Sequence, residues 1–248
     1  QLGILPRLPE EEVTQDHKDL AAALQKTYER EFLRLVETAK KITNSDNLVL
    51  GGGCAYNGLA NTKAYNYYKS IHIPYAPSDA GSAIGACLAE YKGVRKDNSV
   101  PYIGPSFNDI SIRTQLEYFG NKIYYFKYPT EERFLTKVAT LIHSGNIIGW
   151  FQGNMEFGAR ALGNRSILAN PTLPNMKDRI NKVIKKREGF RPFAPMVIKD
   201  KQHDFFEMTD DVPYMNQVVQ VKPQFRDILK AVTHVDGSAR VQTVYKNT

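Results

Sequence analysis

The sequence predicts an α/β protein, and three features of the chain support this prediction. Short apolar runs, such as the one at 47–50, end in glycine-rich loops that lead into helical segments. The order of helix, strand, loop and helix recurs along the chain, which is typical of helices packed on a sheet. Apolar residues make up 42% of the sequence and include 14 Tyr and 12 Phe, which favours packed cores over disorder.

The first part of the chain alternates between the two kinds of element. Apolar residues recur every three or four positions at 14–42, which predicts a helix with one apolar face. Members of that face are Leu20, Leu24, Tyr28, Phe32 and Leu35. Further segments complete the pattern, with strands at 47–50 and 71–75 and helices at 54–68 and 80–91.

A charged stretch that turns Pro- and Gly-containing, at 93–104, predicts a domain boundary. We therefore expect two domains, at 1–104 and 105–248. The second domain is expected to have an irregular loop at 152–170. Its expected helices are 111–119, 131–144 and 175–185, and its expected strands are 123–126, 147–151, 195–198, 214–221 and 239–245.

The composition restricts the class of partner. A net charge of +7 is compatible with an anionic partner, but also with a solvated basic surface. There is no continuous Lys/Arg tract of the kind that binds nucleic acid, and no apolar run of membrane-spanning length. Cys54 and Cys87 are expected to be reduced, buried thiols of a cytoplasmic protein, although one disulfide stays open.

Two short motifs follow the expected strands of the first domain. Glycines at 51–53 let the backbone N–H groups approach a ligand, and Asn57 can offer an amide to a nucleotide. A tight turn explains the same residues equally well. Asp79 follows a strand and begins a helix, so its carboxylate can either bind a metal ion or cap the helix.

Three cation-containing motifs lie in the second domain. The loop at 149–166 combines Gly, Arg and Asn, and such a loop can surround an anion with guanidinium and backbone donors. Four cations at 185–191 are compatible with a phosphate site, a favourable helix C-terminus or a solvated face. His, Asp and Arg surround a glycine at 234–240, as in a polar site or a well-bonded turn.

Taken together, these motifs resemble the signature blocks of NodU/CmcH-type O-carbamoyltransferases. The similar runs are 51–57, 77–86, 153–166, 185–195 and 233–244, in the order expected of that family. The resemblance implies the end of an actin-like domain, like that of threonylcarbamoyl transferases, followed by a YrdC-like twisted α/β domain. It also implies that ATP and carbamoyl phosphate form carbamoyl-adenylate, and that the carbamoyl group passes to a hydroxyl of a sugar or secondary metabolite.

The resemblance implies a role for nine residues. Four cations are implied to be catalytic by holding phosphate or carbamoyl oxygens: Lys185, Arg187, Arg191 and Arg160. Four residues are implied to bind ATP: Gly51, Gly52, Asn57 and Arg240. Asp79 is implied to be a ligand of an iron-type divalent metal.

This sequence departs from the family pattern in several places. Asn154 and Ala159 replace an arginine and a proline of the family's motif. The family's paired metal-binding histidines and its Asn-Thr-Ser-Phe-Asn block are missing, and the chain begins with Gln1. We therefore expect this chain to be an inactive fragment of a longer enzyme. The longer enzyme is expected to bind the metal, and the fragment is expected to lack it. The alternative is a nucleotide- or RNA-binding module without catalysis. The sequence does not predict the acceptor or the oligomeric state.

Overall fold

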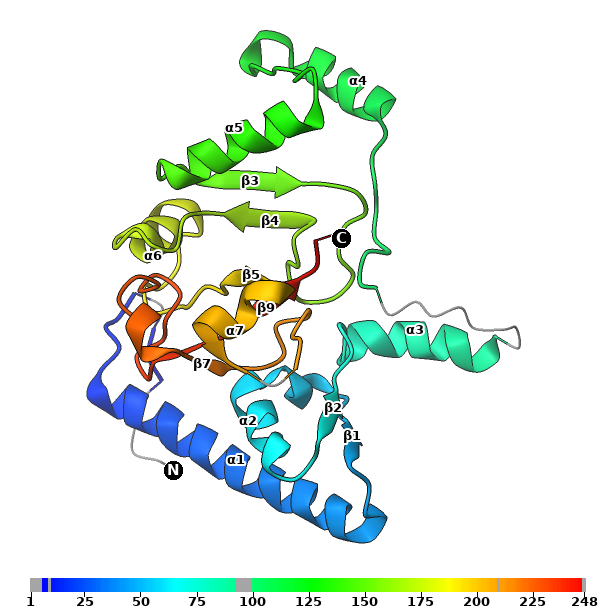
Figure 1. The fold of residues 1–248 in the computed structure, drawn as a ribbon, viewed down its shortest axis with the longest axis vertical. Helices are drawn as coiled ribbons and strands as arrows, with labels where there is room; N and C mark the ends of the chain where they lie inside the picture. The colour runs from blue at the N-terminus through cyan, green and yellow to red at the C-terminus, as the bar shows by residue number, and fades with distance from the viewer. Residues whose placement is uncertain (1–5, 9, 92–99, 209, 247–248) are drawn as a thin grey trace. The chain divides into compact units, whose positions relative to one another are not determined.

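The computed structural model describes residues 6–8, 10–91, 100–208 and 210–246. It contains both helices and strands, which confirms the prediction of an α/β protein (Figure 1). The chain forms two compact units: unit 1 comprises 1–49 and 59–72, and unit 2 comprises 50–58 and 73–248. This division does not coincide with the boundary expected at residue 104. Residues 92–99 of that boundary lie outside the described residues, and the two expected domains stay a prediction.

Unit 1 is built on the long helix α1 (Gln15–Thr43). The chain then forms strand β1 (Asn47–Val49), which pairs in parallel with β2 (Ser70–His72). The short helix α2 (Gly58–Lys63) lies between them in sequence, and all of it except Gly58 belongs to unit 1. The core of the unit joins Val36 of α1 to Ala64 and Tyr68, so the apolar stripe of the helix is buried against the segment between the strands.

In its described part, unit 2 has three small sheets. Strand β3 (Ile148–Phe151) pairs antiparallel with β4 (Arg165–Leu168), and β5 (Met196–Ile198) pairs in parallel with β9 (Gln242–Val244). The third sheet is antiparallel and has the order β6-β7-β8, with bounds Phe206–Glu207, Val219–Val221 and Ser238–Ala239. Its core is aliphatic and aromatic: Val197, Phe206, Val219, Val221, Ala239 and Val241. Side chains from β5 and from the third sheet therefore share one core.

The described residues of unit 2 form five α-helices. Their bounds are α3 (Asp79–Glu90), α4 (Asp109–Phe119), α5 (Glu131–His143), α6 (Met176–Arg179) and α7 (Gln202–Phe205). Helix α5 begins where predicted, because Thr130 accepts a hydrogen bond from the Arg133 N–H. It lies alongside β3 (Figure 1), with Phe134 stacked on Trp150 at 5.5 Å between ring centroids. No helix among the described residues is long and apolar enough to cross a bilayer.

Several predicted elements are wrong. The segment at 123–126 is not a strand: Tyr124, Tyr125 and Phe126 are exposed, and no described strand lies beside them to satisfy their backbone groups. The loop at 152–170 was expected to be irregular but contains β4, which pairs with β3. The strand expected at 214–221 contains only β7 of three residues, and the one expected at 239–245 is split between β8 and β9.

Other corrections concern a helix and several side chains. The helix expected at 54–68 is broken into a 3₁₀ turn (Gly53–Tyr56), α2 and a second 3₁₀ turn (Ala64–Asn66). Both cysteines are exposed rather than buried, because neither packs into a core. Two members of the face expected on α1, Leu24 and Leu35, are also exposed. The packed stripe contains Phe32, as expected, and also Val36, which was not expected.

Candidate functional site

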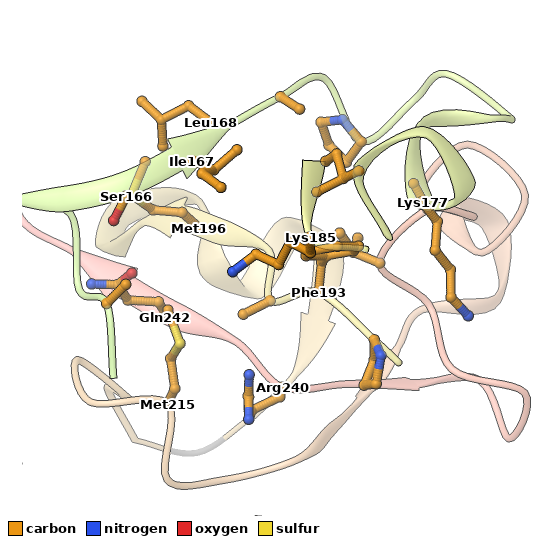
Figure 2. Close-up of a pocket in the computed structure, with 18 of the residues that line it drawn as sticks. Ser166, Ile167, Leu168, Lys177, Lys185, Phe193, Met196, Met215, Arg240 and Gln242 are labelled. Atoms are coloured by element: carbon orange, nitrogen blue, oxygen red, sulfur yellow. The ribbon is translucent and has the colours of Figure 1, made fainter. Parts of the chain in front are cut away.

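A cavity of about 340 Å³ lies within unit 2, beside β4 and the turn that follows α6. Its lining includes five cations: Arg160, Lys177, Lys185, Arg187 and Arg240. Among the described residues that line it there is no Asp or Glu. Figure 2 shows the Lys185 amine and the Arg240 guanidinium extending into the same space, whereas Lys177 lies at the far side. Positive charge without a nearby carboxylate suits an anionic ligand.

The loop between β3 and β4 delivers Arg160 to this cavity. Glu156 closes the loop: its Oε1 accepts backbone N–H groups from Leu162 at 2.6 Å and from Asn164 at 2.8 Å. The Arg165 N–H donates to Oε2 of the same carboxylate at 3.1 Å. Burial raises the pKa of Glu156, but the hydrogen bonds from these backbone donors together outweigh that effect. The pKa of Glu156 therefore lies below its ordinary value. The sequence between Glu156 and β4 is therefore a closed turn, which restricts where Arg160 can lie.

Arg160 and Arg240 each have a buried polar atom that lacks a described partner. The Nε atom of each is buried without a hydrogen-bond partner among the described residues. Burial lowers the pKa of both side chains. For Arg240 the pKa falls to about 10, because burial is reinforced by repulsion from Arg160 and Arg187. A bound anion would accept hydrogen bonds from these buried donors and would reduce the repulsion between the arginines.

Lys185 and Arg187 follow a π-helical turn (Ile180–Ile184) that extends α6. A π-helical turn of this kind is frequent at functional sites. Asn181 in that turn is fully buried, and its Oδ1 accepts the Arg187 Nε–H at 2.7 Å. The guanidinium of Arg187 also lies 5.0 Å from the ring centroid of Phe193. Arg187 is therefore held on the cavity wall by an amide and a ring, neither of which neutralises its charge.

Arg191 is not brought to the cavity. Its Nε–H donates to Glu188 at 3.0 Å, its side chain is 53% exposed, and it does not line the cavity. The structure thus brings three of the four expected catalytic cations together and leaves the fourth in an exposed ion pair. The catalytic role of all four stays a prediction.

The glycine loop at 51–58 belongs to unit 2 but does not line the cavity. Gly52 has φ of +84°, a conformation that favours glycine, and its N–H donates to the Pro77 carbonyl at 2.6 Å. Asn57 ends the 3₁₀ turn, and its N–H donates to the Cys54 carbonyl. Gly51 is exposed in this turn, and the contact of the loop with ATP stays a prediction.

Asp79 is the first residue of α3 and is exposed. The helix cap is Ser78, so capping does not account for Asp79. Within the described ranges no group of three or more His, Cys, Asp or Glu residues is placed to hold a metal ion. The described residues alone therefore do not supply the several ligands in fixed geometry that a first-row metal needs, and the metal role of Asp79 stays a prediction.

We expect this chain to purify without a stoichiometric metal bound through Asp79. One carboxylate alone binds a divalent ion weakly, because affinity comes from several ligands acting together. Elemental analysis of the purified chain and of Asp79→Asn should therefore give the same metal content. Stoichiometric iron that disappears in Asp79→Asn would contradict this expectation.

The sequence motifs did not identify three residues that shape the cavity. Lys177 contributes a cation from α6, Asn181 holds Arg187, and Glu156 closes the loop that carries Arg160. Glu156 lies within a motif that was singled out, and an isolated acid among Gly and Arg was its available signal. Asn181 had only a weak signal, namely an amide within an expected amphipathic helix.

The fold and the cavity together define an α/β protein whose site is lined by cations. Comparison with protein families agrees with the order of the motifs: the carbamoyltransferase N-terminus model matches residues 5–88, and the carbamoyltransferase C-terminus model matches residues 139–248. The chain belongs to the carbamoyltransferase family. The resemblance noted in the sequence is thereby confirmed.

Its similar proteins include several nodulation proteins. Nodulation protein NolNO of Sinorhizobium fredii is 41% identical over 94% of this chain and 36% of its own length. Nodulation protein NolO of Bradyrhizobium diazoefficiens is 38% identical over 95% of this chain and 44% of its own length. Nodulation protein U of Rhizobium fredii is 36% identical over 82% of this chain and 33% of its own length. The chain therefore spans less than half the length of these relatives.

Proposed function

We propose that this chain is part of an ATP-dependent O-carbamoyltransferase, and that its cation-lined cavity binds the phosphate groups used to form carbamoyl-adenylate. The donor is carbamoyl phosphate, and the final acceptor is a hydroxyl of a small molecule such as a sugar. In this proposal, 1–104 is the end of an actin-like domain and 105–248 is a YrdC-like domain. Membership of the carbamoyltransferase family supports the proposal.

One observation carries the assignment to the cavity. Arg160 and Arg240 each keep a buried Nε–H without a described partner, in a cavity that has no described carboxylate in its lining. Phosphate oxygens accept charge-assisted hydrogen bonds from such donors, and one guanidinium often donates two hydrogen bonds to the same phosphate. Transfer of the adenylyl group of ATP to the carbamoyl group, with pyrophosphate as the leaving group, also develops negative charge on phosphate oxygens, and fixed cations stabilise that charge in the transition state. A cavity of about 340 Å³ is in the usual range for a small-molecule site.

Two neighbouring lysines allow a matched test. Lys185 lines the cavity, whereas Lys186 does not. We expect Lys185→Met to weaken the binding of ATP or carbamoyl phosphate about tenfold or more, because a charge-assisted hydrogen bond contributes roughly 1.5–3 kcal/mol. Lys186→Met should leave affinity within about twofold, since it removes the same charge at a distance from the bound anion. Isothermal titration calorimetry with each ligand measures both effects.

A third variant, at Arg191, distinguishes the binding site that the cavity indicates from the one that the family resemblance implies. If Arg191 holds phosphate, as the resemblance implies, Arg191→Gln should bind ATP as weakly as Lys185→Met does. If the cavity alone binds the ligand, Arg191→Gln should behave like Lys186→Met, because Arg191 is exposed and paired with Glu188. Equal affinity of Lys185→Met and Lys186→Met for both ligands would overturn the assignment to the cavity.

A further inference from the structure

We infer that Tyr56 is a positioning residue for Arg160, and that through Tyr56 the glycine loop at 51–58 controls how the cavity binds an anion. The inference rests on the proposed function, because it concerns the same anion site. It adds a contact between two motifs that lie about a hundred residues apart in the sequence.

The surroundings of Arg160 contain one clear orienting group. The guanidinium carbon lies 5.2 Å from the centroid of the Tyr56 ring. The side chain is half-buried, yet its Nε has no hydrogen-bond partner and it forms no ion pair within the part of the chain that the structure describes. A long and flexible arginine without a carboxylate partner needs another contact to hold its head group, and the ring of Tyr56 provides it.

An aromatic ring is well suited to hold a cation that must also bind a ligand. A carboxylate in the same place would neutralise Arg160 and compete with an incoming anion. The Tyr56 ring instead contacts the guanidinium without carrying an opposite charge, and the buried Nε–H of Arg160 has no hydrogen-bond partner among the described residues, so it can donate to a phosphate oxygen. Tyr56 can therefore fix the direction of Arg160 without reducing its charge.

Tyr56 is itself held by its loop. The 3₁₀ turn (Gly53–Tyr56) is closed by the Ala55 N–H, which donates to the Gly52 carbonyl at 3.0 Å. The Ser78 hydroxyl donates to the Tyr56 hydroxyl at a long distance of 3.4 Å. At the end of the loop, a Cβ on Gly58 would lie 3.2 Å from the Gln217 backbone, so the chain passes close to its neighbour there. Displacing the loop would therefore displace the ring that contacts Arg160.

The experiment compares Tyr56→Leu, which removes the aromatic face, with Tyr56→Phe, which keeps it and removes only the hydroxyl. Pyrophosphate serves as the probe, and calorimetry measures its affinity for the 248-residue chain. We expect Tyr56→Leu to bind about fivefold more weakly, in line with the usual strength of a cation–π contact. Tyr56→Phe should stay within about twofold of the parent chain. Tyr124→Leu, at a fully exposed tyrosine, is the control for losing a ring.

A double-mutant cycle with Arg160→Met tests whether the effect passes through Arg160. In the Arg160→Met background, Tyr56→Leu should cause no further loss of affinity. The inference is overturned if Tyr56→Leu weakens binding equally in both backgrounds, or if Tyr56→Phe binds as weakly as Tyr56→Leu.

Urea unfolding of the same four proteins gives a readout that needs no ligand. Tyr56→Leu and Arg160→Met should show coupled rather than additive shifts of the unfolding midpoint, because they remove one shared contact. If the parent chain binds neither pyrophosphate nor ATP, the proposed function fails, and the unfolding cycle then decides alone whether Tyr56 holds Arg160. Additive shifts would refute the contact.

Discussion

Replacing Arg240 with methionine should stabilise the ligand-free chain and strongly weaken its affinity for phosphate-bearing ligands. Burial, and then the charges of Arg160 and Arg187, lower the pKa of Arg240 well below its ordinary range, to about 10. A lowered pKa means that the charged side chain is less stable in the folded chain than in the unfolded chain. The shift corresponds to about 3 kcal/mol at 1.36 kcal/mol per pKa unit.

The measurable gain should be smaller, because methionine also loses contacts that the arginine makes. We expect the free energy of unfolding at pH 7 to rise by about 1–2 kcal/mol, and the affinity for ATP to fall about a hundredfold. The pH dependence has a definite sign. The penalty of the charged Arg240 is fully present below its folded pKa of about 10 and declines as pH rises above that value. The advantage of the variant should therefore shrink only in strongly alkaline solution.

Urea unfolding at pH 7, with and without ATP, tests both effects of Arg240→Met. Arg113→Met is a suitable control, because Arg113 is exposed on α4 and does not line the cavity. The control should change stability by less than about 0.5 kcal/mol. An Arg240→Met chain that is less stable than its parent, or that still binds ATP tightly, would contradict the cost and the role assigned to this cation.

Replacing Glu156 with glutamine should destabilise the chain and loosen the loop that carries Arg160. The carboxylate accepts N–H groups from Leu162, Asn164 and Arg165, whereas the glutamine amide would place an N–H group against one of these donors. Loss of the charge and of one acceptor should lower the free energy of unfolding by about 2–3 kcal/mol. The affinity for ATP should also fall, because Arg160 then samples more orientations.

The pH dependence again has a definite sign. The folded pKa of Glu156 lies below its ordinary value of 4.5, so its stabilisation is present above about that pH and is lost as pH falls through the folded pKa. The difference between the parent chain and Glu156→Gln should therefore be full at pH 7 and fade in acid below that value. Glu117→Gln, at an exposed position of α4, is the matched control and should show no such difference. A Glu156→Gln chain as stable as this control would refute the closing role of the carboxylate.

Local sequence patterns were sufficient to predict most of the helices. Residues near the ends of α3, α4 and α5 carry their own signals, such as the Thr130 cap and Gly120 after α4. These signals act over a few residues, so they can be read without knowing what lies elsewhere in the chain. The order of the motifs was equally readable, and it indicated the carbamoyltransferase family before any contact was known.

Pairing between distant segments could not be read in the same way. The run at 123–126 has the composition of a strand but has no described neighbour to pair with, whereas 165–168 becomes β4 because it lies against β3. A strand is stabilised by its partner, and the identity of the partner depends on the whole fold.

The site shows the same division. The sequence by itself determined that Arg160, Lys185 and Arg187 occur in motifs compatible with anion binding, and the family resemblance added Arg240. Only the tertiary structure decided that these four line one cavity and that Arg191 instead pairs with Glu188. The same holds for the contact between Tyr56 and Arg160, and for the buried amide of Asn181 behind Arg187. The physical reason is that chemical type belongs to each residue, whereas burial, repulsion and the choice of partner arise only when distant segments pack together.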